Sequence, residues 1–184
     1  DIYEGQKKIY LSGELVGVEI TNSVGQVKFH NLPIGEYYAI EKEAPRGYQL
    51  FTGKWFISVK YDSTNVKTEV TETQKTLENE VIYGRVNLVK TDGKHALLKD
   101  AIFELYTSND ELITTLETNE DGILITPDLR YGSYYLKELN APIGYWLDPT
   151  PIPFTIEDHD KTLYVTAPNA LIEAKIHVSK VDSE

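Results

Sequence analysis

The segment at residues 118–145 reads TNEDGILITPDLRYGSYYLKELNAPIGY, and the segment at residues 21–48 reads TNSVGQVKFHNLPIGEYYAIEKEAPRGY. They align without a gap and share the Thr-Asn, Tyr-Tyr, Ala-Pro and Gly-Tyr pairs and one glutamate. Such a repeat indicates two copies of one structural unit in tandem. A second repeat relates ENEVIYGRVNLVKTD to APNALIEAKIHVSKVD, and in it Asn79 precedes Lys90 by as many residues as Asn169 precedes Lys180.

Short runs of β-type sequence fill each unit, and turn residues separate them. In the second unit these runs are GRVNLVK, AIFELYT, ELITTLE, GILIT, SYYLKEL, IPFTIE and TLYVTA. Period-two alternation is typical of β-strands, and several short strands in a unit of roughly ninety residues indicate a sandwich. Prolines at positions 149, 151 and 153 remove backbone donors, which predicts an edge strand or a connector. The sequence thus predicts an all-β fold of two tandem β-sandwich domains.

The repeats also set the expected domain boundaries. Residues 1–83 form the first domain, residues 84–173 the second, and residues 174–184 the first strand of a further unit. Residues 1–3 align with residues 104–106, inside the second strand of the second domain, so the first domain is expected to lack its N-terminal strand. The chain therefore holds one complete unit, one unit without its first strand, and one first strand without its unit.

Composition argues against several classes of function. The chain has 184 residues and a net charge of −11, which argues against nucleic acid and anionic membrane as partners. No apolar run approaches the length needed for membrane insertion. Cysteine is absent, which removes disulfides, thiol nucleophiles and thiolate metal sites. A small extracellular domain without disulfides needs another staple or a good core.

No metal or cofactor is expected. The four histidines are scattered and lack the spacing of metal ligands. The segment Glu117–Asp128 nearly fits a calcium loop, with Gly122 at the sixth position. However, its Ile-Leu-Ile run is typical of a strand, so a hairpin turn is predicted there.

Three polar residues of the second domain stand at the ends of apolar rows. Side chains alternate along a strand, so Lys90, Glu138 and Asn169 each share a face with the residues two and four positions earlier, which are apolar or aromatic. A lysine that snorkels to water, or a Lys–Glu ion pair, would explain each residue taken alone. Three coincident placements, two of which recur at identical spacing, favour a shared chemical role.

Burial makes this combination reactive, because it favours the neutral forms of an amine and of a carboxylic acid. The neutral Lys90 amine is then a nucleophile for the carboxamide carbon of Asn169. Glu138, as an acid, polarises that carboxamide and transfers protons. The product is an amide between Nζ and Cγ, with ammonia released. The pattern thus predicts a single self-crosslinking turnover and no enzyme activity on other molecules.

The two units resemble the Cna B-type, or SpaA-like, domains of Gram-positive pilins and adhesins. The resemblance is carried by GRVNLVKTD, DAIFELYT, TNEDG, GSYYLKELNAPIGY and the terminal Asn169, and in the first unit by GEYYAIEKEAPRGY. It implies transthyretin-like or Ig-like sandwiches, and a Lys90–Asn169 isopeptide bond promoted by Glu138. In the first domain Glu41 and Asn79 match the acid and the amide, whereas the lysine position lies before residue 1.

The resemblance implies a stalk or spacer of a cell-surface adhesin or pilus protein, extracellular and anchored to the cell wall through its parent. Its partners would be adjacent domains of that parent. The alternative is a ligand-binding adhesin module that recognises a host protein or glycan, and a third possibility is a carboxylate-based glycosidase. Two nearly identical units favour spacing over a unique site, and the repeat offers no second catalytic carboxylate near Glu138.

In the repeat alignment, the sequence starts inside the second strand of one unit and stops after the first strand of another. This raises the possibility that two chains associate. A domain without its first strand and a lone first strand are complementary, so head-to-tail strand addition could join them. Lys180 of one chain would then be crosslinked to Asn79 of the next. The alternative is that the missing strand belongs to a longer parent chain and that residues 174–184 only overhang a domain boundary.

Overall fold

A computed structural model gives the placement of residues 2–4, 7–60 and 76–182. Within these ranges there is no helix, and therefore none that is long and apolar enough to cross a membrane. The chain divides into two compact units, unit 1 with Asp1–Ala44 and Leu50–Asn79, and unit 2 with Pro45–Gln49 and Glu80–Glu184. The predicted all-β fold of tandem domains is confirmed.

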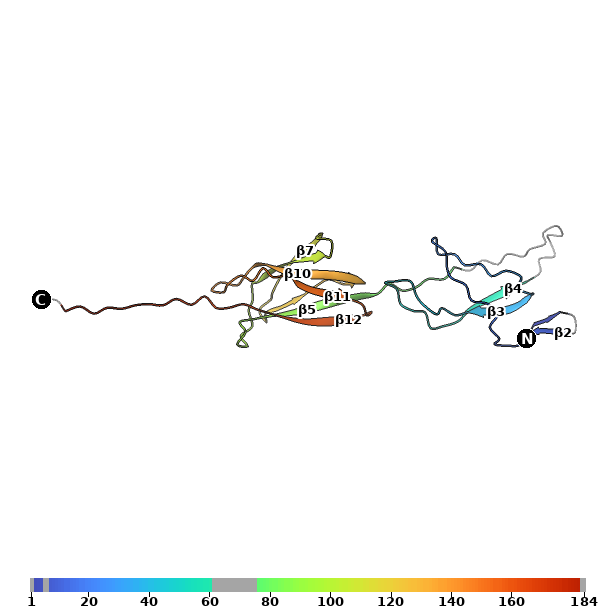
Figure 1. Ribbon diagram of the computed structural model, residues 1–184. Coiled ribbons are helices and arrows are strands. Elements are labelled where there is room, and N and C mark those ends of the chain that lie inside the picture. Colours follow the sequence, from blue (N-terminus) through green and yellow to red (C-terminus); the bar gives the residue numbers. More distant parts are fainter. Residues whose placement is uncertain (1, 5–6, 61–75, 183–184) are drawn as a thin grey trace. The chain divides into compact units, whose positions relative to one another are not determined.

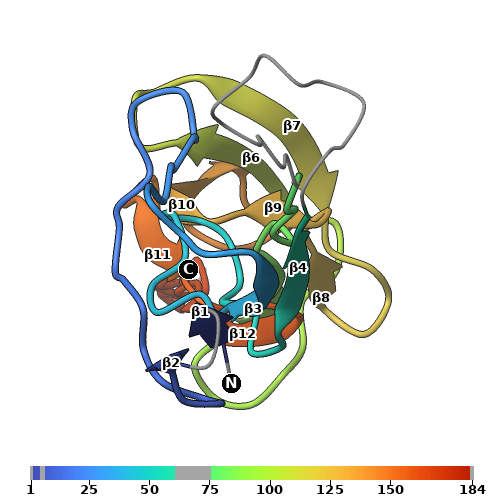
Figure 2. The ribbon, with the colours of Figure 1, turned by 90° about the vertical axis from the view of Figure 1, so that its right-hand side faces the viewer.

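Unit 2 is a sandwich of two sheets (Figures 1 and 2). One sheet has the order β11-β10-β6-β7, with strands Ile152–Ile156, Gly132–Asn140, Ile102–Thr107 and Leu112–Glu117. The other has the order β12-β5-β8, with strands Lys161–Pro168, Tyr83–Thr91 and Ile123–Ile125, and the short β9 (Leu129–Arg130) also pairs with β5. The strand β5 runs parallel to β12 and antiparallel to β8 and β9. Every described pairing in this second sheet therefore involves β5.

The core of unit 2 lies between the two sheets. Its fully buried side chains come from both sheets and from the loops between them: Val86, Leu88, Ala101, Phe103, Leu105, Leu124, Leu129, Leu136, Ile156 and Ala167. Along β5, residues at alternate positions from Gly84 to Lys90 are buried, and those between them are at least partly exposed. This is the expected result of period-two alternation in a strand with one face on the core.

The proline-rich segment forms the edge strand that the sequence predicts. The strand β11 lies at the end of its sheet and pairs only with β10, where Pro153 stands opposite Tyr135. A proline cannot donate to a second neighbour, so it is tolerated at a sheet edge but not in a central strand.

The described strands of unit 1 repeat part of the local structure of unit 2. Its strands form the pairs β1-β2 (Ile2–Glu4 and Lys7–Tyr10) and β3-β4 (Gly35–Ala39 and Trp55–Val59). The pair β3-β4 has the register of β10-β11, because Gly35 stands opposite Val59 as Gly132 stands opposite Ile156. Tyr37 and Tyr134 each donate to the carbonyl four residues earlier.

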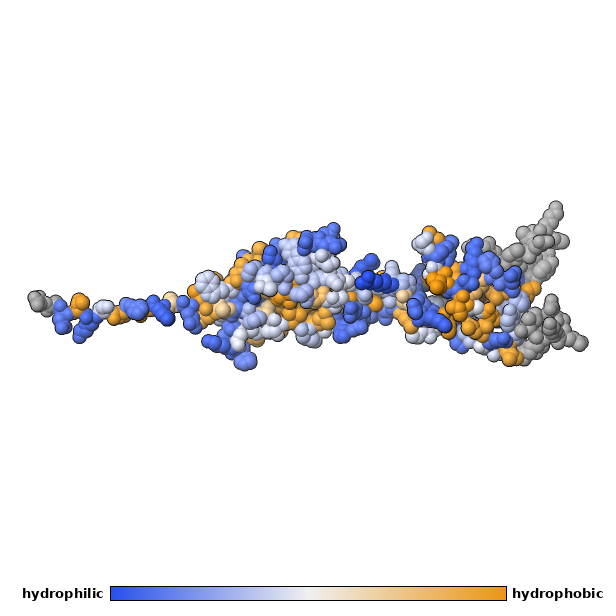
Figure 3. Space-filling model, in the orientation of Figure 1, coloured by the Kyte–Doolittle hydropathy of each residue, from blue (hydrophilic) through white to orange (hydrophobic). Residues whose placement is uncertain are grey.

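The side chains described in unit 1 include none that is fully buried. Large apolar residues are instead open to solvent, among them Ile20 at 89% exposed, Phe56 at 74% and Leu15 at 71%. Figure 3 shows such residues over the surface of this unit. Among its described residues, the strand pairs of unit 1 therefore enclose no fully buried apolar side chain.

The segment predicted as the first strand of a further unit forms no strand over its described residues, 174–182. Residues 172–182 pair with no described strand, and their apolar side chains are exposed, with Ile176 and Val178 each at 87%. Residues 183 and 184 lie outside the described residues. The assignment of residues 174–184 to a further unit stays a prediction.

Replacing Leu136 by alanine is expected to lower the free energy of unfolding of unit 2 by about 2–5 kcal/mol, because the fully buried side chain leaves a cavity. Lys137→Ala, on the exposed face of the same strand, is the matched control and should change it by less than about 0.5 kcal/mol. Denaturant unfolding followed by circular dichroism measures both. Equal losses in the two variants would contradict the placement of the core.

Candidate functional site

The structure brings Lys90, Glu138 and Asn169 together inside unit 2. Lys90 is the last buried residue of β5, Glu138 lies near the end of β10, and Asn169 follows β12 directly. Their exposed fractions are 1%, 3% and 3%. The alternation of side chains along each strand directs Lys90, Glu138 and Asn169 to the core. The packing of the two sheets then brings these three side chains into contact.

One carboxylate contacts both of the other groups. The Nζ atom of Lys90 lies 3.0 Å from Oε1 of Glu138, an ion-pair contact between two buried side chains. The Nδ2 atom of Asn169 donates to Oε2 of Glu138 at 2.9 Å. The backbone N–H of Asp148 also donates to Oε2, at 2.9 Å. Glu138 therefore faces the amine with one oxygen and the amide nitrogen with the other.

The backbone around Lys90 is held on both sides. Its N–H donates to the carbonyl of Gly122 at 2.8 Å, and its carbonyl accepts from the N–H of Leu98 at 2.9 Å. Gly122 has a φ of 67°, and a Cβ atom there would lie 2.9 Å from the Lys90 carbonyl oxygen. A side chain would therefore be strained by its φ and would collide with the strand, so glycine is required at this position.

Burial is the largest influence on the protonation of Lys90 and disfavours its charged form. Burial lowers the pKa of the Lys90 ammonium, while the carboxylates of Glu138 and Asp148 act in the opposite direction. The Nζ atom also lies 5.6 Å from the centre of the Phe103 ring, a favourable position for a cation.

The Oδ1 atom of Asn169 is buried and has no hydrogen-bond partner among the described residues. The carboxamide thus has an unsatisfied oxygen, and a buried orphan acceptor is costly.

Unit 1 contains the same acid–amide pair. The Nδ2 atom of Asn79 donates to Oε2 of Glu41 at 2.6 Å, and the N–H of Phe51 donates to that oxygen at 2.9 Å. Phe51 follows Glu41 by as many residues as Asp148 follows Glu138. Among the side chains described in unit 1, no lysine forms an ion pair with Glu41. Lys180 lies in the exposed segment at residues 172–182, which forms no strand.

A family model, "SpaA: Prealbumin-like fold domain", matches residues 2–74 and again residues 84–170. The two matches cover most of the chain. The chain belongs to this family. Its two units are therefore SpaA-like domains, and the family resemblance that the sequence indicates is confirmed.

The chain is similar to parts of several named proteins. The Bacillus anthracis TIE protein has a solved structure with a TM-score of 0.75 and 28% identity, covering 84% of this chain and 28% of that one. The trypsin-resistant surface T6 protein of Streptococcus pyogenes serotype M6 is 42% identical over 48 residues, or 26% of this chain and 9% of its own length. The solved T6 backbone pilin is 30% identical over 42% of this chain and 17% of its own, with a TM-score of 0.39. This chain therefore covers less than a third of the length of each of these proteins.

The segment considered as a calcium loop is a tight turn. The Oδ1 atom of Asn119 accepts the backbone N–H groups of Asp121 and Ile123, and Asn22 makes the same bonds in unit 1. The described residues hold no group of three acidic, histidine or cysteine side chains suited to a metal. The predicted hairpin is wrong, because β7 pairs with β6 and β8 pairs with β5, so the turn connects the two sheets.

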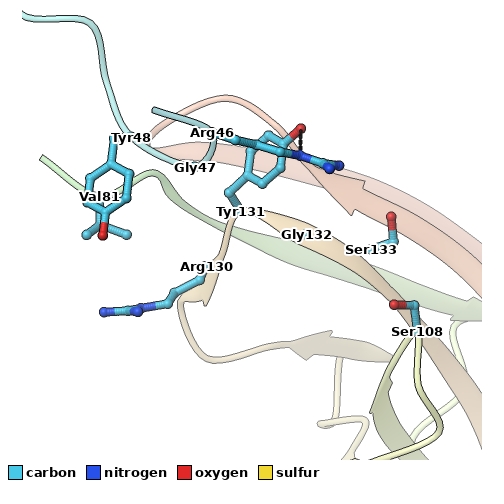
Figure 4. A pocket seen from close by; sticks show the side chains of 9 residues that line it. All are labelled: Arg46, Gly47, Tyr48, Val81, Ser108, Arg130, Tyr131, Gly132 and Ser133. Carbon is cyan, nitrogen blue, oxygen red and sulfur yellow. Dashed lines mark hydrogen bonds between the residues drawn. The ribbon is translucent and has the colours of Figure 1, made fainter. Parts of the chain in front are cut away.

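Unit 2 also has a shallow hollow of about 440 Å³ (Figure 4). Arg46 lies across the ring of Tyr131 and donates from Nε to its hydroxyl oxygen at 3.3 Å. Arg130, Ser108 and Ser133 lie along the same hollow. No pair of carboxylates lines it, so it lacks the groups of a glycosidase. A host ligand for the chain stays a prediction.

Two features of the site were not predicted from the sequence. The backbone bond from Asp148 to Glu138 comes from a loop without a recognisable motif, although its equivalent at Phe51 shows that the repeat preserves it. The contact of Gly122 with Lys90 was also missed. Its signal was the glycine shared by the two units, Gly25 and Gly122, both of which have a positive φ.

An Asn169→Ala chain keeps a free amine at Lys90 and should reveal its lowered pKa. A lysine whose pKa is lower in the folded state binds fewer protons there than in the unfolded state. The free energy of unfolding should therefore rise as the pH increases toward the ordinary lysine pKa. The Lys90→Met/Asn169→Ala chain is the control and should lack this increment. Parallel pH profiles of the two chains, measured by denaturant unfolding, would contradict the assignment.

Proposed function

We propose that this chain is a structural stalk or spacer module of a cell-surface adhesin or pilus protein, and that unit 2 locks itself with a Lys90–Asn169 isopeptide bond. Membership of the SpaA family and likeness to T6, a surface protein and backbone pilin, support the stalk role. The observation that carries the bond is the buried Glu138 carboxylate in contact with both Lys90 and Asn169.

The chemistry uses only these three side chains. A proton passes from the Lys90 ammonium to Oε1 of Glu138, which leaves a neutral pair in the core. The Nζ atom then attacks Cγ of Asn169. Glu138 transfers its proton to Nδ2 and takes up the surplus proton of Nζ. The Cγ–Nδ2 bond breaks, ammonia leaves, and Glu138 holds the new amide by a hydrogen bond. The site acts once, on its own chain, and needs no cofactor.

The position of the bond suits a load-bearing domain. The strands β5 and β12 are the first and last of unit 2, and their parallel pairing sets Ala167 beside Lys90. The N–H of Asn169 continues the ladder by donating to the carbonyl of Thr91 at 2.9 Å. By analogy with a disulfide, a link closing a loop of roughly 80 residues stabilises the folded state by about 4–5 kcal/mol.

Repetition of the connecting segment supports a tandem arrangement. The N–H of Ile82 donates to the carbonyl of Gly47 at 2.9 Å, and Ile172 donates to Gly144 at 2.8 Å in the same way. Ile82 packs against the core of unit 2, whereas Ile172 remains 47% exposed. A following SpaA-like unit would cover Ile172 as unit 2 covers Ile82. Adjacent domains of an extracellular, cell-wall-anchored parent protein are therefore the proposed partners.

The intact mass tests the proposal most directly. The purified chain should be lighter than its sequence by one ammonia, and Lys90→Ala and Glu138→Ala should each restore the full mass because the nucleophile or the proton carrier is lost. Lys94→Ala removes an exposed lysine and should leave the ammonia deficit unchanged. A folded wild-type chain with the full sequence mass would refute the isopeptide bond.

Force spectroscopy tests the mechanical role. Because the bond links the two strands through which force enters and leaves unit 2, the residues between positions 90 and 169 should not extend. The Lys90→Ala chain should show an added unfolding step of roughly 25 nm. If the wild-type chain already gave that step, unit 2 would bear load without a covalent link.

A further inference from the structure

The carboxylate of Glu138 has three polar contacts among the described residues. Oε1 lies 3.0 Å from Nζ of Lys90, and Oε2 accepts from Nδ2 of Asn169 at 2.9 Å and from the backbone N–H of Asp148 at 2.9 Å. Formation of the isopeptide bond alters the first two contacts, because Nζ becomes part of the new amide and Nδ2 leaves as ammonia. The N–H of Asp148 is the contact of the three that the reaction leaves unchanged.

A carboxylate needs such a contact to keep its orientation. The last torsion of a glutamate side chain has a broad energy profile, so the side chain alone does not fix its two oxygens. Rotation about that bond would turn Oε1 away from Nζ and Oε2 away from Nδ2 together. A donor on Oε2 that does not react holds both oxygens in place throughout, and correct orientation of reacting groups contributes strongly to the rate.

The donor is itself held in a turn. Oδ1 of Asp148 accepts the backbone N–H of Thr150 at 3.0 Å, which closes an Asx-type turn. Pro149, between these two residues, has a fixed φ and restricts the backbone of the residue before it. The hydroxyl and the N–H of Thr150 lower the pKa of the Asp148 carboxyl, so the acceptor of this turn stays ionised. The N–H of Asp148 is therefore presented to Oε2 in a preset direction.

Unit 1 contains the same contact on its own acid. The N–H of Phe51 donates to Oε2 of Glu41 at 2.9 Å, and in both units the donor follows the acid by 10 residues. The side chains at the two donor positions differ, since one is a phenylalanine and the other an aspartate. The feature that recurs is the backbone contact, which indicates that the contact itself has a role.

We propose that Asp148 is a positioning residue for the isopeptide reaction, and that its backbone N–H holds the Glu138 carboxylate toward Lys90 and Asn169 while these two groups react. This role rests on the function proposed for unit 2. The Asp148 side chain acts differently, because its carboxylate favours the charged form of Lys90. Loss of that carboxylate favours the neutral amine, so it does not slow the reaction by making the nucleophile less available.

The kinetics of crosslinking in the full chain test this role. Chain synthesised directly into denaturant stays unreacted, dilution starts folding, and the intact mass then follows the loss of ammonia. Asp148→Pro lacks the N–H and should form the bond about 10- to 100-fold more slowly than the wild type. Asp148→Asn keeps the N–H and a side-chain acceptor for Thr150, so this conservative variant should recover most of that loss. Equal rates in Asp148→Pro and the wild type would contradict the role.

A backbone ester guards against misfolding of the proline variant. Replacement of the peptide N–H of residue 148 by an ester oxygen removes only the donor and should slow the reaction by a similar factor. The same replacement at Leu147, whose N–H has no hydrogen-bond partner among the described residues, is the matched control and should leave the rate unchanged. A slower reaction that merely follows a loss of folded chain, measured by circular dichroism, would overturn the inference.

These measurements also separate the positioning role from the function on which it rests. If the wild-type chain loses one ammonia and the ester at residue 148 reacts equally fast, the role of Asp148 is refuted and the isopeptide bond stands. A folded wild-type chain that never loses ammonia would refute both.

Discussion

The carboxylate of Glu138 joins the two sheets of unit 2 at one end of the sandwich. It lies on β10 in one sheet, while Lys90 and Asn169 belong to β5 and the end of β12 in the other. An isolated charge in a core costs several kcal/mol, so neither the ammonium nor the carboxylate is tolerated there without its partner. The contact that makes the burial of Lys90 tolerable is also the one that holds an amine and a carboxamide on the same acid.

A covalent bond at this point would take the place that disulfides hold in many small extracellular domains. The chain contains no cysteine, and the core of unit 2 is small. An amide formed inside the core is shielded from water and reductants, and it needs no oxidant to form. Because it joins the first strand to the last, it would protect the strands between them against a pulling force as well as against heat.

Comparison of the two units distinguishes features that form locally from those that need the whole domain. The pair β3-β4 adopts the register of β10-β11, and the tyrosine and asparagine turns recur in both units, although unit 1 has no buried core among its described side chains. Hairpin register and turn geometry are set by neighbours in sequence. In unit 2 the strand β5 pairs with β12, β8 and β9 and so brings strands that are distant in sequence into one sheet.

Local features of the chain were determined by the sequence itself. Alternation along each strand placed Lys90, Glu138 and Asn169 on buried faces, the prolines marked β11 as an edge, and the repeat revealed two units. Only the tertiary structure decided that one acid contacts both the amine and the amide, that Asp148 and Gly122 support the site, and that the turn at Asn119 joins two sheets. The physical reason is distance along the chain. Alternation depends on backbone geometry at adjacent residues, whereas the contacts of Glu138 join strands far apart in sequence, which only the packing of two sheets brings together.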